Sequence, residues 1–137
     1  MSEENENNED KTPGRICWTE LMSHDLEGSK KFYGELLGWK YEEMKMPNGG
    51  SYVFGTPDGG GKPTAGLMQL PPEAGKMPTS WGTYITVEDL AASVEKAKSL
   101  GATVVRDITE IPMGKFAFIA DPQGGVIGLW ETGECPE

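Results

Sequence analysis

Residues 17–38 read CWTELMSHDLEGSKKFYGELLG, and this stretch decides the fold. Its first seven residues alternate in polarity, which predicts a strand. Asp25 follows, and its carboxylate can accept hydrogen bonds from the free amides of a first helical turn. Apolar residues then recur at helical spacing as far as Gly38, a residue typical of a left-handed helix end. The stretch therefore predicts a strand followed by a short capped helix.

The same pattern returns 64 positions later, in residues 81–101 (WGTYITVEDLAASVEKAKSLG). Asp89 takes the place of Asp25, and Gly101 takes the place of Gly38. Five pairs of residues are identical at this offset: Thr19 and Thr83, Asp25 and Asp89, Leu26 and Leu90, Ser29 and Ser93, and Leu36 and Leu100. After each predicted helix come three strand-like runs, at 39–46, 51–56 and 64–70 in the first copy and at 103–111, 115–120 and 126–131 in the second.

Two βαβββ modules result, and we predict an α+β fold in which they form a cupped, open, eight-stranded, barrel-like sheet with the helices outside. A single module leaves one sheet face uncovered, so two modules together can enclose a concave site. The predicted organisation is one domain at 15–132, with modules at 15–70 and 80–132, a linker at 71–79 and a C-terminal tail at 133–137.

The chain has 137 residues and a formal net charge of −10. Residues 1–14 carry five acids in their first ten positions, so we expect a solvated tail or an acidic arm that docks on a partner. Beyond Lys11 the chain still has 17 acids against 11 bases, which disfavours nucleic acid and anionic membranes as partners.

No apolar run is long enough for a membrane span, and the acidic N-terminus is unlike a secretory signal. Cys17 and Cys135 are the two cysteines, too few for a disulfide framework. These features predict a cytoplasmic protein with free thiols.

Asp25-Leu26 before a helix that bears Phe32-Tyr33, followed by Leu37-Gly38-Trp39, resembles the first module of the vicinal oxygen chelate (VOC) superfamily. Residues 118–124 (FIADPQG) resemble its closing hairpin. The superfamily includes glyoxalase I, the bleomycin-resistance proteins and the extradiol dioxygenases. The resemblance covers about residues 15–132, and it implies the fold more firmly than any one chemistry.

The resemblance also implies where a divalent metal would be held. In the catalytic members, His, Gln or Glu ligands stand seven residues before the Asp at each helix start and seven residues after the Asp of the closing hairpin. Those positions here are Trp18, Gly82 and Gly128, and the internal repeat adds Gly66. None of these side chains can ligate a cation, so we expect no metal and no cofactor. The only histidine, His24, is interpreted as a solvated turn residue.

Strand parity places a set of aromatic, apolar and acidic side chains on the cavity face, together with Thr64, Thr86 and Val126. The glycines are expected to leave room beside them. The predicted ligand-binding residues are Trp18, Glu20, Met22, Met68, Tyr84 and Trp130. The alternative is that Trp18, Met68 and Trp130 fill the cavity as core, and that Glu20 bonds to a neighbouring strand or reaches solvent.

These residues predict a glyoxalase-like or bleomycin-resistance-like protein, metal-free, that binds a small planar or apolar molecule between its modules. A homodimer is the expected assembly. The alternative is a lyase or dioxygenase-type enzyme that uses an atypical metal site, or Glu20 as a general base. The sequence leaves open whether the protein is an enzyme.

Overall fold

The computed structural model describes residues 12–46, 50–72 and 75–133. The order βαβββ occurs twice along the chain, which confirms the α+β class and the two-module repeat. The elements are β1 (Ile16–Ser23), α2 (Leu26–Leu37), β2 (Lys40–Lys45), β3 (Ser51–Thr56), β4 (Ala65–Gln69), β5 (Ser80–Thr86), α3 (Leu90–Ser99), β6 (Thr103–Ile111), β7 (Gly114–Ala120) and β8 (Val126–Thr132).

The chain forms two compact units. The first unit spans Trp18–Gly82, and the second consists of Thr83–Glu137 together with the residues up to Cys17. The division therefore falls inside β1 and β5, so that the start of each strand and its remainder belong to different units. We keep the names first unit and second unit below.

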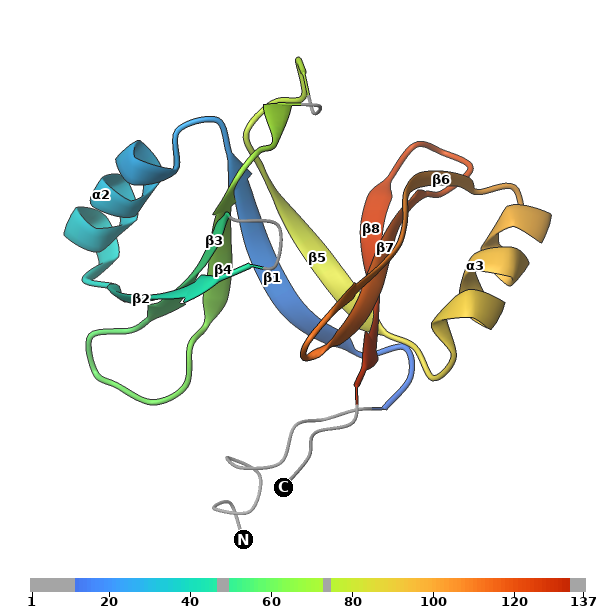
Figure 1. Ribbon diagram of the computed structural model, residues 1–137, viewed down its shortest axis with the longest axis horizontal. Coiled ribbons are helices and arrows are strands. Elements are labelled where there is room, and N and C mark those ends of the chain that lie inside the picture. The colour runs from blue at the N-terminus through green and yellow to red at the C-terminus, as the bar shows by residue number, and fades with distance from the viewer. Residues whose placement is uncertain (1–11, 47–49, 73–74, 134–137) are drawn as a thin grey trace, which may run out of the picture. The chain divides into compact units, whose positions relative to one another are not determined.

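In the first unit the strand order is β2-β3-β4-β1, with β1 and β4 parallel and the other pairs antiparallel. Helix α2 covers one face of this sheet (Figure 1). The core between them is built from Leu21, Leu26, Val53 and Leu67, with Tyr33, Trp39 and Tyr41 packed around it. Because side chains alternate along a strand, the neighbours of these core residues point to the opposite face.

The second unit repeats this plan with the order β5-β8-β7-β6 and a parallel pair β5 and β8. Helix α3 covers one face of the sheet (Figure 1). Its core contains Leu90, Val94, Ala117, Ile119 and Leu129. Each unit thus buries one sheet face under its helix and leaves the other face without a helix.

The predicted helix ends are confirmed. The Asp25 carboxylate accepts a hydrogen bond from the Gly28 amide at 3.0 Å, and Asp89 accepts one from the Ala92 amide at 3.0 Å. Gly38 has a φ of 76° and Gly101 a φ of 102°, a conformation that side chains with a Cβ atom rarely adopt. The predicted Asp residues thus cap the starts of both helices and Gly38 caps the end of α2, whereas the end of α3 is capped by Leu100, with Gly101 directly after it.

Two predicted tail features fall partly outside the described residues, because these exclude residues 1–11 and 134–137 and therefore Cys135. Gly14, which the sequence places in the tail, donates its amide hydrogen to the Thr86 carbonyl at 2.8 Å. Across the described residues, neither helix has the length and apolar character that crossing a membrane requires.

Candidate functional site

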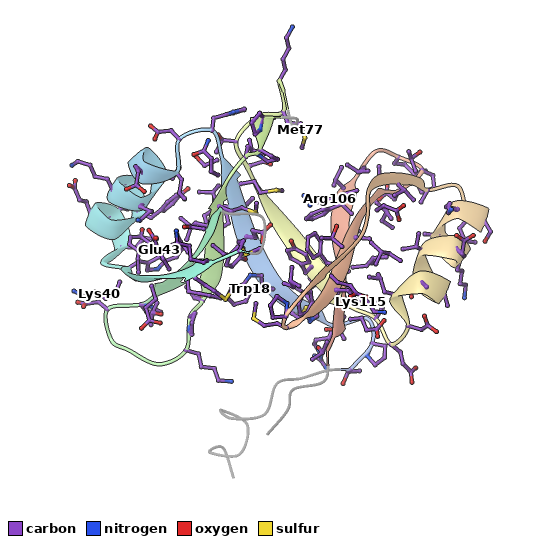
Figure 2. All side chains as sticks on the ribbon, in the orientation of Figure 1. Trp18, Lys40, Glu43, Met77, Arg106 and Lys115 are labelled. Atoms are coloured by element: carbon purple, nitrogen blue, oxygen red, sulfur yellow. The ribbon has the colours of Figure 1, made fainter. Side chains whose placement is uncertain are left out.

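The first helix-free face is the side of the β2-β3-β4-β1 sheet that lies away from α2. Leu21, Val53 and Leu67 point toward the helix, so alternate residues of the same strands point away from it. Figure 2 labels Trp18 on this side of the sheet. The face carries Trp18, Glu20, Met22, Tyr52, Phe54 and Met68.

A hydrogen-bonded series joins three of these residues. The Trp18 indole Nε1 donates to the Tyr52 hydroxyl oxygen at 2.7 Å, and the Tyr52 hydroxyl donates to Glu20 Oε1 at 2.7 Å. Glu20 is only 3% exposed, and no described buried side-chain nitrogen or oxygen lacks a hydrogen-bond partner. The burial of this carboxylate is therefore offset by hydrogen bonds.

Tyr52 is the polar centre of this face. Burial, and then the neighbouring charge of Glu20, raise the pKa of the Tyr52 phenol well above its ordinary value. The phenol is consequently protonated at neutral pH and acts as a donor toward Glu20. Phe54 packs edge-on against Tyr52, with ring centroids 5.2 Å apart, and is tilted against Trp18 at 6.2 Å.

The expectation that the glycines leave room holds at Gly82, where a Cβ atom would meet nothing closer than 4.0 Å, but it is wrong at Gly66 and Gly128. A Cβ atom at Gly66 would collide with the Tyr52 hydroxyl. A Cβ atom at Gly128 would lie 2.6 Å from Tyr84 Cδ2 and 3.0 Å from Phe118 Cε1. The rings of Tyr52, Tyr84 and Phe118 lie across these two glycines and fill the space.

The second helix-free face is the side of the β5-β8-β7-β6 sheet that lies away from α3. Tyr84, Phe116 and Phe118 form a ring cluster on it, with centroids 5.3 to 6.1 Å apart. Trp130 lies directly across from Phe116 in the strand register and donates from Nε1 to Thr132 Oγ1 at 3.1 Å. This face carries Tyr84, Arg106, Phe116, Phe118 and Trp130.

The register between the first and last strands is equivalent in the two modules. Glu20 lies opposite Gly66, and Tyr84, which is 64 positions after Glu20, lies opposite Gly128. The two modules therefore pair their first and last strands in the same way. Trp18, Gly66, Gly82 and Gly128 offer no ligating side chain, and the described residues contain no group of three His, Cys, Asp or Glu side chains suited to a metal ion. The residues present do not fit a metal.

The structure divides the six predicted ligand-binding residues between the two faces. Trp18, Glu20, Met22 and Met68 lie in the first unit, with Met22 opposite Met68, whereas Tyr84 and Trp130 lie in the second unit. Sequence reasoning missed four aromatic residues that touch these positions, namely Tyr52, Phe54, Phe116 and Phe118. Their signal was present in the alternation of residues 51–56 and 114–120, where every second residue is aromatic or small.

Three other residues of interest are His24, Cys17 and Thr86. His24 is exposed at the turn before α2, where its Nε2 contacts the Met77 carbonyl oxygen. Cys17 is a free cysteine whose Sγ lies 3.6 Å from the Tyr84 carbonyl oxygen. Thr86 is buried and lines an open pocket of about 360 Å³ beside the start of α3, which also includes Pro13, Val87 and Lys96.

Comparison with known proteins gives a consistent result. Residues 15–129 match the model of the Glyoxalase/Bleomycin resistance protein/Dioxygenase superfamily. The "Putative glyoxylase CFP32" of Mycobacterium tuberculosis (strain CDC 1551 / Oshkosh) is 37% identical over 121 residues, which cover 87% of this chain and 46% of that protein. The "Anthracycline biosynthesis protein DnrV" of Streptomyces peucetius is 27% identical over 132 residues, which cover 88% of this chain and 48% of that protein. The chain thus spans about half the length of these two curated relatives.

Solved structures show the same fold. The crystal structure of methylmalonyl-CoA epimerase from Mycobacterium tuberculosis superimposes with a TM-score of 0.63 at 17% identity, covering 95% of this chain and 96% of that one. At this level of identity the similarity concerns the arrangement of strands and helices and carries no activity across.

Proposed function

The chain belongs to the Glyoxalase/Bleomycin resistance protein/Dioxygenase superfamily, and from this premise we propose that it is a metal-independent binding protein for a small planar or apolar molecule. The observation that carries the proposal is the hydrogen-bonded series from Trp18 through Tyr52 to Glu20 on the first helix-free face. It holds a carboxylate in place beside aromatic rings that no helix covers.

This arrangement suits a ligand with a flat apolar body and one donor group. Trp18 and Phe54 offer ring surfaces for stacking, and Met22 and Met68 offer adaptable apolar contacts. Glu20 accepts from Tyr52 through Oε1, and an ionised carboxylate can accept several further hydrogen bonds. A ligand amine or hydroxyl can therefore share the carboxylate with Tyr52, and an amine is also attracted by the indole face.

The filled glycine positions support metal independence. A ligating Glu, Gln or His at position 66 would need the space that the Tyr52 hydroxyl occupies. The same holds at position 128, where Tyr84 and Phe118 approach the backbone. Tight packing makes such space costly to regain, since inserting a side chain forces its neighbours off their preferred rotamers. We therefore propose that positions 66 and 128 contribute to binding through the aromatic rings that cover them.

The name of the Streptomyces peucetius relative points to a suitable probe. An anthracycline is a planar polycyclic aromatic compound, and the glycosylated members carry an amino sugar whose ammonium group is a cation. This is the chemistry that a carboxylate beside aromatic rings would recognise. We use daunorubicin, which is itself fluorescent, as the test ligand.

The test is a titration of daunorubicin with the full chain, followed by fluorescence anisotropy. We expect saturable binding that Glu20→Gln weakens by about tenfold or more, because the variant removes a charge-assisted hydrogen bond. Trp18→Ala should also weaken it. Glu35→Gln is the matched control, since this exposed glutamate on α2 carries the same charge. Absent binding, or equal affinity in Glu20→Gln and Glu35→Gln, would overturn the proposal.

An enzyme is the second candidate, and the burial of Glu20 favours it. A carboxylate withdrawn from water beside a protonated phenol could serve as a general base in a lyase. Elemental analysis of the purified protein separates the candidates in part, because stoichiometric Ni, Zn, Fe or Mn would support a metal-dependent lyase or dioxygenase. We further propose that the protein is a cytoplasmic homodimer. Native mass spectrometry of the same sample would report a retained ligand and test the dimer.

A further inference from the structure

The second helix-free face carries a guanidinium group that pairs with no carboxylate in the described part of the chain. Arg106 is one of two arginines in a chain with 22 acids and 12 bases. Its contacts are with neutral groups: the guanidinium lies 5.5 Å from the centroid of the Phe116 ring, and Nε donates to Thr109 Oγ1 at 3.3 Å. Among the described residues it forms no ion pair, although five ion pairs involve lysines elsewhere.

Arg106 reaches this position through an irregularity of its strand. The pairing of β6 with β7 shifts register between Val104 and Arg106 and again between Arg106 and Thr109. Such bulges bend a strand and redirect side chains, and they are frequent beside functional sites. Figure 2 labels Arg106 on the side of its sheet away from α3. The bulges therefore place a cation over the aromatic cluster of this face.

The aromatic cluster beneath Arg106 is fixed. Phe116 packs edge-on against Tyr84 at 6.1 Å and against Phe118 at 5.7 Å, and Trp130 lies across from Phe116 in the register. Gly128 permits this packing, because a Cβ atom there would meet both Tyr84 and Phe118. The contact with the Phe116 ring and the bond to Thr109 restrict the guanidinium, and its two terminal nitrogens can form paired hydrogen bonds with a carboxylate or sulfonate.

We infer that the second helix-free face is a binding site for a planar aromatic anion, in which Arg106 binds the anionic group and Phe116 and Trp130 contact the ring. The inference does not rest on the function proposed above, because it uses residues of the second unit and a ligand of opposite charge. In a protein with a net charge of −10, an anion needs a local cation to bind.

A pair of probes tests the inference. The first is 8-anilinonaphthalene-1-sulfonate, a fluorescent aromatic anion, and the second is N-phenyl-1-naphthylamine, which has the same rings without the sulfonate. We expect Arg106→Gln to weaken binding of the sulfonate by about tenfold, because a charge-assisted hydrogen bond is lost. Binding of the neutral probe should change by less than about twofold, and added salt should weaken only the sulfonate.

Lys98→Gln is the matched control. It removes one positive charge from α3 of the same unit, where Lys98 pairs with Glu95 at 3.0 Å. Arg106→Lys keeps the charge but loses the planar fork, so an intermediate affinity is expected. Equal loss for both probes would show that Arg106 only supports the packing, and it would overturn the inference, as would wild-type affinity for the sulfonate in Arg106→Gln. Near-ultraviolet circular dichroism checks that each variant is folded. The two proposals fail separately, because Glu20→Gln is read with daunorubicin and Arg106→Gln with the sulfonate.

Discussion

The Tyr52 hydroxyl occupies the position that a side chain at Gly66 would need. The two residues lie on neighbouring antiparallel strands, with Tyr52 opposite Met68 and Phe54 opposite Gly66. The Tyr52 ring thus leans diagonally across Gly66 to reach Glu20, which is the residue beside Gly66 on the other flanking strand. A side chain at position 66 and the bond between Tyr52 and Glu20 exclude one another.

Gly66→Ala should therefore destabilise the fold. One methyl group at this position displaces a buried phenol and breaks its bond to Glu20, and overpacking of this kind typically costs about 1 to 3 kcal/mol. The measurement is the free energy of unfolding from urea denaturation. Gly59→Ala is the control, because nothing lies within 4 Å of a Cβ atom there and its φ is not positive. If the two variants are equally stable, Tyr52 does not occupy the space beside Gly66.

Tyr52 should also make stability fall at alkaline pH. Its pKa in the folded protein is raised by burial and by the charge of Glu20, whereas in the unfolded chain it returns to about 10. Above that pH the unfolded state releases a proton that the folded state keeps. The contribution of Tyr52 to the free energy of unfolding is therefore complete below a pH of about 10. It is lost as the pH rises further, by about 1.4 kcal/mol per pH unit.

The check compares the wild type with Tyr52→Phe. The variant should show a shallower fall in the free energy of unfolding above pH 10, whatever its stability at neutral pH. Tyrosinate absorbance adds a second measurement: in the folded protein, removal of Tyr52 should leave the amplitude of the alkaline titration unchanged, because this phenol does not ionise before unfolding. A reduced amplitude would show that Tyr52 is accessible to hydroxide.

Most of the fold could be predicted because its signals are local. Alternation gave the strands, and Asp25 and Gly38 gave the ends of the first helix, since each acts through backbone groups within a few residues. The set of side chains that share a face followed from alternation along each strand, because a slip of one residue would turn the core side chains outward. Two of the eight strands have the predicted bounds, and the other six differ from them by one residue at one or both ends, where assignments are least sharp.

The chemistry of the two faces could not be predicted in the same way. Strand parity places Tyr52 on the same face as Glu20, but the diagonal reach of its ring across Gly66 depends on distances between three strands. Arg106 was missed for a different reason. Counting alternate residues fails across a bulge, and the pairing of β6 shifts on both sides of Arg106. The residues that sequence reasoning missed are those whose contacts cross strands.

Trp81 also contacts residues that are distant in the sequence. We therefore expect its replacement to lower the free energy of unfolding by more than its exposure suggests. Trp81 is the second residue of β5 and is 40% exposed. Its ring nevertheless lies 5.5 Å from that of Tyr33 and 6.3 Å from that of Trp39, and Nε1 donates to the Tyr33 hydroxyl at 3.2 Å. Trp81→Ala should cost about 1 to 3 kcal/mol, which is below the value for a fully buried tryptophan. Trp81→Phe, which keeps a ring but loses the indole donor, should cost less.

Met77→Ala is the control for Trp81→Ala in the same urea experiment. Met77 is 41% exposed and belongs to the same unit, but only its backbone carbonyl forms a described hydrogen bond, and the substitution leaves that group in place. Its cost should stay within about 0.5 kcal/mol, as for most surface substitutions. Trp81 and Tyr33 are 48 residues apart in the sequence. Because Tyr33→Phe removes only the hydroxyl, a double-mutant cycle of this variant with Trp81→Ala isolates their hydrogen bond. Additive effects in that cycle would mean that Trp81 stabilises the first unit through ring contacts alone.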